Sequence, residues 1–340
     1  MNYSEKFENI KNMIGNTPLL EITLKYKGEK RKLYAKAEYF NLTGSIKDRV
    51  AYYILENAYK TGKIKESDII VEATSGNTGI AFSALGSYLG HNVIIYMPDW
   101  MSKERINLMK SYGAEIRLVS KEEGGFLGSI KMTEELAEKG GVFLPCQFSN
   151  EDNTKAHYIT TGKEISNQLK AIGLKADAIV AGVGTGGTIM GIARRLKEDN
   201  PECKAFPLEP LNSPTLSTGY KTGAHRIQGI SDEFIPPILK MEEMDNVVSV
   251  DDIDSIIIAK MLSKKFGIGV GISSGANILG CLKAQDIIGK DKVIVTVLAD
   301  DNKKYLSTDY SEDWEIKDSY MTKDIELVSV KAYRQKNIQK

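Results

Sequence analysis

Midway along the chain the sequence reads Ala178-Ile179-Val180-Ala181-Gly182-Val183-Gly184-Thr185-Gly186-Gly187-Thr188. A short apolar run meets a glycine-rich turn, and an amphipathic stretch follows at 187–197. This order predicts a buried strand, a tight turn and a helix. Backbone N–H groups in such a turn converge on an anion, helped by the helix dipole. The stretch therefore indicates an α/β fold with a phosphate-binding loop, although a plain strand-to-helix turn has the same pattern.

Short apolar runs and amphipathic stretches alternate along most of the chain, which is typical of a parallel sheet with helices on both faces. Strands are expected at 32–39, 69–72, 92–97, 115–119, 178–182, 204–207 and 292–299. Helices are expected at 48–61, 78–89, 102–112, 126–138, 153–169, 187–197, 251–265 and 275–286. A stretch rich in Gly, Pro and Ser at 209–236 exceeds a usual connection, and long loops of this kind are often functional.

Composition excludes several classes of function. The 45 acidic and 45 basic residues balance, so no overall field favours nucleic acid or an anionic membrane. No secretory signal and no apolar run of membrane-spanning length is recognised, which predicts a cytoplasmic protein. The scattered cysteines and histidines lack metal-ligand spacing, so no metal site is expected. These residues are Cys146, Cys203, Cys281, His91, His157 and His225.

The glycine loop alone leaves two functional interpretations open. Gly182, Gly184 and Gly187 fit the G-x-G-x-x-G spacing of dinucleotide-binding folds. Glu209 follows at the end of the next expected strand, about where a ribose-binding acid lies in an NAD-dependent dehydrogenase. An NAD-dependent dehydrogenase and an enzyme with another phosphorylated cofactor would both bind a phosphate at this loop.

A second turn discriminates between these interpretations. It reads Glu72-Ala73-Thr74-Ser75-Gly76-Asn77-Thr78-Gly79 and also joins a strand to a helix. Capping the helix would need only one of its hydroxyl or amide side chains. The surplus donors fit a bound carboxylate. An enzyme that holds both a phosphate and an amino-acid carboxylate explains two such turns, and a dehydrogenase does not.

Lys47 occupies an unusual position, at the start of an expected helix in Asn41-Leu42-Thr43-Gly44-Ser45-Ile46-Lys47-Asp48-Arg49. Ser45 and Asp48 have oxygens that can accept N–H groups of the first turn. A cation is disfavoured at this end of the helix dipole. That conflict suggests a lysine that is neutral or covalently modified, as in a Schiff base, while a solvated lysine is the alternative.

In combination these motifs resemble the cysteine synthase and cystathionine β-synthase family, the β-replacement branch of fold-type II pyridoxal-phosphate (PLP) enzymes. The resemblance covers about residues 8 to 308 and implies the tryptophan synthase β-subunit-like fold, with two three-layer α/β/α domains. The motifs that carry it, in chain order, are 16–19, 41–49, 74–79, 101–105, 157–162, 184–188, 227–230, 271–277 and 305–308.

The resemblance implies a role for each matched position. Lys47 would bind PLP as a Schiff base and remove the Cα proton of the substrate. Asn77 would bind the 3′ oxygen of PLP, and Ser273 the pyridine nitrogen. The phosphate would be held by Gly184, Thr185, Gly186, Gly187 and Thr188. The substrate would be bound by Thr74, Ser75, Asn77, Thr78, Gln147, Gly229 and Ser231. Gln147 as a strand-end hydrogen-bonding residue and Ser273 as a cap of a helix starting near Gly275 are the structural alternatives.

A serine partner for the pyridine nitrogen has a chemical consequence. A neutral hydroxyl does not enforce a protonated ring, so a long-lived carbanion is disfavoured. Loss of a β-substituent then gives an α-aminoacrylate that a second nucleophile attacks, and β-elimination and β-replacement fit better than transamination.

The chain departs from its family after Gln228-Gly229-Ile230. The usual continuation is Gly-Ala-Gly in cysteine synthases and Gly-Tyr-Asp in cystathionine synthases, but here it is Ser231-Asp232-Glu233. Glu233 can take the place of the Asp in the Gly-Tyr-Asp sequence of cystathionine synthases. Asp232 could orient or deprotonate a small nucleophile such as water, and its charge would repel hydrosulfide. A loop-closing or solvated Asp232 is the alternative.

We therefore expect a smaller domain at 40–148, a larger domain at 1–39 with 149–315, PLP between them, and a tail at 316–340. The favoured reaction releases hydrogen sulfide from L-cysteine and forms L-serine. Cysteine synthase, minimal cystathionine β-synthase and lanthionine synthase activities are alternatives. An NAD-dependent dehydrogenase and a partner-binding protein without catalysis are the other classes considered. The resemblance also implies a homodimer with a small amino-acid substrate.

Overall fold

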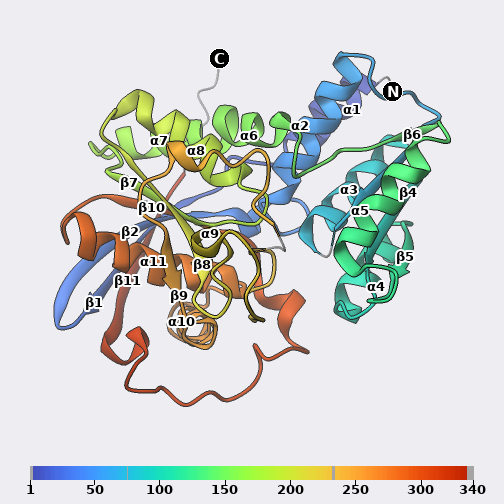
Figure 1. Cartoon of the computed structure of the whole chain (residues 1–340). Helices are drawn as coiled ribbons and strands as arrows, with labels where there is room; N and C mark the ends of the chain where they lie inside the picture. The colour runs from blue at the N-terminus through green and yellow to red at the C-terminus, as the bar shows by residue number, and fades with distance from the viewer. Residues whose placement is uncertain (1–2, 75, 232–233, 335–340) are drawn as a thin grey trace. The chain divides into compact units, whose positions relative to one another are not determined.

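The computed structural model describes residues 3–74, 76–231 and 234–334. It divides into two compact units, Met1–Gly15 with Asn41–Ala156, and Asn16–Phe40 with His157–Lys340 (Figure 1). The N-terminal residues belong to the first unit because Phe7 and Ile10 are buried in its core. The sequence analysis had placed 1–39 together in the larger domain.

The first unit contains a four-stranded sheet in the order β5-β4-β3-β6, whose recorded pairings are all parallel. Side chains of alternate residues face opposite sides of a strand. Ile70 and Ile95 therefore pack with α2 and α3, whereas Val71 and Ile94 pack under α5. The elements are α1 (Tyr3–Lys11), α2 (Lys47–Lys60), β3 (Ile69–Ala73), α3 (Asn77–Leu89), β4 (Val93–Pro98), α4 (Lys103–Ser111), β5 (Glu115–Val119), α5 (Gly125–Ala137), β6 (Val142–Phe143) and α6 (Glu151–Ala156).

The second unit is built on a seven-stranded sheet in the order β11-β1-β2-β10-β7-β8-β9. Strand β1 is antiparallel to both its neighbours, and the pairs from β2 to β9 are parallel. Figure 1 shows α7 and α8 on one side of this sheet and α10 and α11 on the other. Its strands are β1 (Leu19–Tyr26), β2 (Glu29–Ala37), β7 (Ala178–Gly182), β8 (Lys204–Pro210), β9 (Val248–Val250), β10 (Ile294–Leu298) and β11 (Ile325–Tyr333).

The helices of this unit include a π-helical segment, His157–Gly162, which interrupts the single helix expected at 153–169. The α-helices are α7 (Lys163–Lys170), α8 (Gly187–Asp199), α9 (Thr215–Thr218), α10 (Asp252–Phe266) and α11 (Ile272–Ile288). Short 3₁₀ turns lie at η1 (Glu38–Phe40), η3 (Met241–Glu243), η4 (Asn302–Tyr305) and η5 (Met321–Asp324).

The expected α/β class is confirmed, with parallel strands and covering helices in both units. The sequence analysis missed α1, α9 and the strands β1, β6, β9 and β11. The tail beyond 315, for which no place was expected, pairs with β1 as the edge strand β11. Within the described ranges, no helix combines the length and the apolar character that crossing a bilayer requires.

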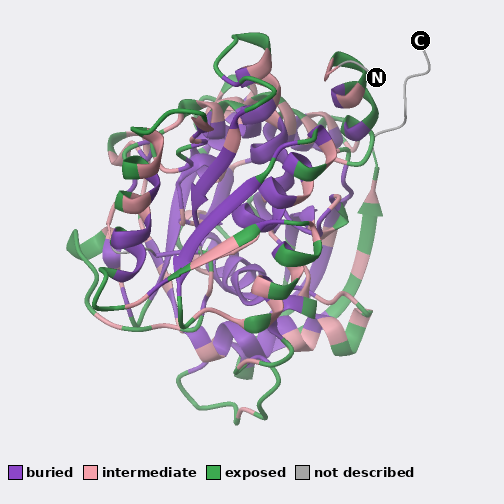
Figure 2. Ribbon diagram, turned by 90° about the vertical axis from the view of Figure 1, so that its right-hand side faces the viewer, coloured by how far each residue is buried: buried purple, intermediate pink, exposed green. Residues whose placement is uncertain are grey.

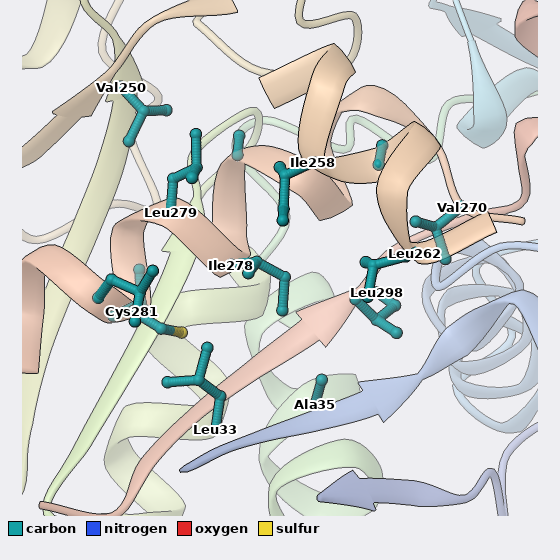
Figure 3. Close-up of a cluster of buried hydrophobic side chains, with 14 of the residues drawn as sticks. Leu33, Ala35, Val250, Ile258, Leu262, Val270, Ile278, Leu279, Cys281 and Leu298 are labelled. Atoms are coloured by element: carbon teal, nitrogen blue, oxygen red, sulfur yellow. The ribbon is translucent and has the colours of Figure 1, made fainter. Parts of the chain in front are cut away.

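The core of the second unit lies where α10 and α11 pack on the sheet. Figure 3 shows apolar side chains of both helices meeting those of β2 and β10. Helix α11 is buried almost all round, and its buried residues are mostly apolar or small. A Cβ at Gly275 would lie 2.0 Å from the Ser255 carbonyl oxygen of α10, so glycine permits this close packing. In Figure 2 most strands are buried over most of their length, while exposed residues concentrate in loops and in a few strands such as β5 and β11.

This packing predicts that Leu279→Ala lowers the free energy of unfolding of the second unit by about 2–5 kcal/mol, because it leaves a cavity in α11. In a Trp100→Phe background, urea denaturation followed by Trp314 fluorescence reports on this unit. Leu306→Ala is the matched control, since Leu306 is 55% exposed, and it changes stability by less than about 0.5 kcal/mol. Equal losses in both variants would contradict the assignment of this core.

Candidate functional site

Lys47 is the first residue of α2, and the loop before it is fixed by hydrogen bonds. The Ser45 hydroxyl accepts the Lys47 N–H at 3.3 Å, as expected. Asp48 does not cap the helix. Its buried carboxylate instead accepts the backbone N–H of Thr43 at 2.7 Å and the Thr43 hydroxyl at 2.5 Å. This loop sets the backbone position of Lys47 at the positive end of the helix dipole.

Helix α3 starts at Asn77, directly after β3 and the turn of surplus donors. Its N-cap is Gly76, and no side chain in the described part of the chain caps it. Thr74 instead accepts the Gly76 N–H at 3.3 Å, and Thr78 donates to Gln147 Oε1 at 2.6 Å. The alternative of a merely capped helix start is therefore not supported for the described residues. Ser75 lies outside them.

Gln147 is held on this turn by several hydrogen bonds. Its Nε2 donates to the Ala73 carbonyl at 3.2 Å, and its own carbonyl accepts from Asn153 Nδ2 at 2.8 Å. Its backbone N–H donates to Glu72 Oε2 at 3.3 Å, while Glu72 Oε1 accepts the Ala73 N–H at 3.0 Å. Gln147 thus joins Thr74, Thr78 and Asn77 around one helix start, as the sequence had indicated.

The carboxyl group of Glu72 is a feature of this site that the sequence analysis missed. Burial raises the pKa of Glu72 to about 8, and the N–H donors of Gln147 and Ala73 partly offset the rise. The only sequence signal was an acid inside an apolar strand.

The glycine loop ends at the start of α8, where Gly186 is the N-cap with φ 87°. A Cβ at Gly184 would lie 2.4 Å from the Gly229 carbonyl oxygen, so only glycine fits between these two backbones. The Thr185 hydroxyl accepts the N–H of Gly187, the first residue of α8, at 3.4 Å. The N-cap glycine has no side chain to cap the next N–H groups, which can bind an anion. This cradle, together with the threonine hydroxyls of the loop, fits the phosphate of PLP.

His157 orients the phosphate loop and was not recognised from the sequence as a site residue. It is fully buried, and its Nε2 lies 3.3 Å from the Thr188 hydroxyl. Its Nδ1 lies 2.9 Å from the hydroxyl of Thr161, inside the same π-helical segment. Interruptions of this kind are frequent at functional sites.

Glu209, the candidate ribose-binding acid, is already engaged inside the protein. Its carboxylate is 1% exposed and accepts the backbone N–H groups of Leu216 at 2.8 Å and Ser217 at 3.2 Å. It also accepts from Ser249 Oγ at 3.2 Å. Glu209 therefore holds the start of α9 and is not available to bind a ribose, which removes the main support for the dehydrogenase interpretation.

Ser273 is the second residue of α11, which begins at Ile272 and not near Gly275. The N-cap is Gly271, so the alternative of Ser273 as the helix cap is wrong. Ser273 is 8% exposed, and the adjacent Ser274 accepts the Ala299 N–H at 2.9 Å, which fixes the helix start against the end of β10.

The loop at 227–231 is fixed against the phosphate loop of the same unit. Ser231 donates its N–H to the Val183 carbonyl at 2.7 Å, and its hydroxyl donates to the Ser213 carbonyl at 2.9 Å. Ser231 has φ 56° and Gly229 has φ 87°, a sharp turn. Asp232 and Glu233 lie outside the described residues.

The two halves of the expected site are thus each assembled within their own unit. The first holds Lys47 and the turn with Gln147, and the second holds the glycine loop, Ser273 and the 227–231 loop. Among the residues that the structure describes, no group of three or more His, Cys, Asp or Glu side chains is arranged to hold a metal ion.

Comparisons with known proteins agree with these observations. The family model described as "Pyridoxal-phosphate dependent enzyme" matches residues 10–300. A probable cysteine synthase of Bacillus subtilis is 42% identical over 302 residues, which are 88% of this chain and 96% of that protein. A solved hydrogen sulfide-producing enzyme of Fusobacterium nucleatum is 57% identical, covering 98% of this chain and 100% of that one, with a TM-score of 0.95. Its D232N variant, solved with an α-aminoacrylate intermediate, covers 96% and 99% with a TM-score of 0.93.

The buried Glu72 predicts a pH dependence of stability. Its pKa of about 8 in the folded chain lies above the usual 4.5, so between these values the unfolded chain loses its proton while the folded chain keeps it. Stability therefore falls as pH rises from about 4.5 to 8, by up to about 1.4 kcal/mol per pH unit, and is constant again above 8.

Urea denaturation of wild type and Glu72→Gln at pH 5, 6.5 and 8 measures this slope. The variant loses the downward slope, whatever its absolute stability. Glu135→Gln, at a carboxylate that is 56% exposed in the same unit, keeps the wild-type slope and serves as control. Parallel curves for wild type and Glu72→Gln would refute a protonated Glu72.

Proposed function

Because this chain belongs to the cysteine synthase family of pyridoxal-phosphate dependent enzymes, we propose that it catalyses β-elimination and β-replacement on L-cysteine or a related β-substituted alanine. Its main reaction is the release of hydrogen sulfide from L-cysteine with formation of L-serine by water addition. Cysteine synthesis from O-acetylserine and sulfide, or a minimal cystathionine β-synthase reaction, is the second candidate, because the B. subtilis relative is a probable cysteine synthase. A cytoplasmic homodimer is part of the proposal.

The start of α3 is the observation that carries this proposal. It offers backbone N–H groups without a side-chain cap in the described chain, beside the hydroxyl of Thr78 and the amide of Gln147. An α-carboxylate fits these donors because its charge is stabilised by the helix dipole and by charge-assisted hydrogen bonds. Thr74, Ser75, Asn77, Thr78 and Gln147 thus bind the amino-acid substrate.

The remaining assignments follow the chemistry of the donor groups. PLP, when bound, supplies the electron sink that allows the Cα proton of an amino acid to leave. Lys47 anchors it covalently and, once released, accepts that proton. Gly184, Thr185, Gly186, Gly187 and Thr188 bind its phosphate, Asn77 its 3′ oxygen, and Ser273 its pyridine nitrogen.

Asp232 is the proposed determinant of the second half-reaction. It replaces a residue that is uncharged in related enzymes, and a carboxylate can take a proton from water as it attacks Cβ. The same charge repels hydrosulfide, which disfavours cysteine synthesis. The solved F. nucleatum enzyme supports this assignment, because it produces hydrogen sulfide and residue 232 is an aspartate in both chains.

Lys47→Ala is predicted to abolish turnover of L-cysteine. The wild-type enzyme treated with borohydride retains PLP covalently on the peptide that contains Lys47, and mass spectrometry of a digest detects the added mass. Lys60→Ala is the matched control, since Lys60 ends the same helix α2 at the surface, and it behaves as wild type. Covalent label on another lysine would disprove the assignment.

Asp232→Asn is predicted to lower the rate of L-serine formation from L-cysteine by about 10²–10⁴-fold, the usual contribution of a general base. The first turnover still releases sulfide, because that step needs Lys47. Rapid-quench measurement of sulfide and serine in the same samples separates the two steps. Glu233→Gln is the neighbouring control. If Asp232→Asn forms serine at the wild-type rate, water activation by Asp232 is wrong.

A further inference from the structure

The segment 306–320, here called the C-terminal segment, follows η4 and lies beyond the 10–300 match of the family model. It is attached to α10 near its middle and directly after its last residue. Lys260 of α10 donates to the Glu312 carbonyl at 2.6 Å, and Asp254 of α10 accepts the Met321 N–H at 2.7 Å just after the segment. Tyr310 is buried in the core of the unit. The segment therefore has a defined position.

Arg226 connects this segment to the substrate loop. Its Nε donates to Asp309 Oδ2 at 2.5 Å, and its guanidinium lies 5.5 Å from the centre of the Trp314 ring. Trp314 is itself held by a hydrogen bond from its Nε1 to the Asp309 carbonyl at 2.9 Å. Two residues of the C-terminal segment thus form one surface that binds a planar cation.

The opposite side of Arg226 is fixed by Asp252, in the first turn of α10. The Asp252 carboxylate is fully buried and accepts the Arg226 backbone N–H at 2.9 Å and Nη1 at 3.5 Å. It also accepts from Asn212 Nδ2 at 3.1 Å, in the connection after β8. A buried carboxylate needs such donors to offset its desolvation. Asp252 therefore holds both ends of the 212–226 connection at one point.

Arg226 directly precedes the loop that carries Gly229 and Ser231. Ile227, the next residue, is fully buried, and the loop then passes against Val183 and Gly184 of the phosphate loop. The far side of the loop is thus fixed by the phosphate loop, and its near side is fixed at Arg226.

Arginine suits this position better than lysine would. Burial acts to lower the pKa of Arg226, but the carboxylates of Asp309 and Asp252 outweigh it and raise that pKa above its ordinary value, so the cation persists. A planar guanidinium can stack on an indole and donate in two directions, whereas an ammonium is a point charge on a flexible stem.

We propose that Arg226 is a positioning residue that ties the substrate loop 227–231 to the C-terminal segment through Asp309 and Trp314. The inference rests on the proposed function for what the loop does, because Gly229 and Ser231 are assigned there to substrate binding. The side chain of Arg226 donates to Asp309 and Asp252, so we assign it a positioning role and no contact with substrate. It acts by keeping the loop in place until the second nucleophile has added.

A loosened loop changes the products in a specific way. If water adds to the elimination product on the enzyme, L-serine forms. If the elimination product leaves the enzyme first, its hydrolysis in solution gives pyruvate and ammonia. Both outcomes consume one cysteine and one water and release one hydrogen sulfide. The ratio of pyruvate to serine therefore measures retention by the loop and does not depend on the fraction of active enzyme.

Arg226→Gln is predicted to raise the pyruvate-to-serine ratio about tenfold over wild type, with PLP content and melting temperature near the wild-type values. Arg226→Lys gives a smaller rise, because it keeps the charge and loses the fork and the stacking. Asp309→Asn raises the ratio as well, and adds little in the Arg226→Gln background, because both changes break the same contact. Asp309 is 51% exposed, so its variant carries the test if Arg226→Gln does not fold.

Lys323→Gln is the matched control, since Lys323 pairs with exposed Asp318 in the same part of the chain, and its product ratio stays at the wild-type value. A wild-type ratio in both Arg226→Gln and Asp309→Asn would overturn the role of Arg226. Wild-type enzyme that forms no serine would overturn the proposed function instead. The Arg226 variants are then judged on O-acetylserine with sulfide, by the ratio of pyruvate to cysteine, where the same rise supports the role and its absence overturns it.

Discussion

The cofactor and substrate residues depend on one constraint, that the first backbone N–H groups of an α-helix have no partner inside the helix. Helices α3, α8 and α11 all begin after glycine N-caps, which have no side chain of their own to cap the helix. Helix α10 provides the contrast within the same chain. There Asp251 accepts the N–H groups of Ile253 and Asp254 at 2.9 and 3.0 Å, in the way usual for a structural helix start. The sequence therefore caps α10 with its own carboxylate and keeps the other three starts for ligand groups.

Buried acidic side chains hold the loops around these helix starts. Glu72, Glu209 and Asp252 each accept backbone N–H groups from a loop. A carboxylate can accept several such bonds at once, so one side chain fixes a turn that has no regular backbone pairing. The cost of burial appears in the raised pKa of Glu72, because the N–H groups of Gln147 and Ala73 offset only part of it. At Asp252 the cation of Arg226 offsets part of the cost of burying the carboxylate. The loops around these helix starts thus depend on buried acids that accept backbone N–H groups.

The sequence predicted the parts of this fold whose signals are local. The bounds of β5 and β7 are as expected, because each is a short run of apolar and β-branched residues between turn residues. Strands β1 and β11 were missed because both mix charged with apolar residues, and because their pairing joins distant parts of the chain, with Leu19 opposite Tyr333. The residues around the anion-binding turns were predicted from glycines and hydroxyls. Glu72, His157 and Arg226 were not, because their roles are set by partners that lie far along the chain.

The position of Arg226 separates membership of the family from the choice of product, which a comparison of motifs treats as one property. Lys47, the glycine loop and the α3 turn determine that the chain is a PLP enzyme of this family, and they would serve any member of it. The 227–231 loop is fixed on one side by the phosphate loop and on the other by Arg226. Its second anchor reaches Asp309, outside the part of the chain that the family model matches. Product choice can therefore change through the C-terminal segment while the cofactor residues stay the same, which gives relatives with the same motifs a physical route to different reactions.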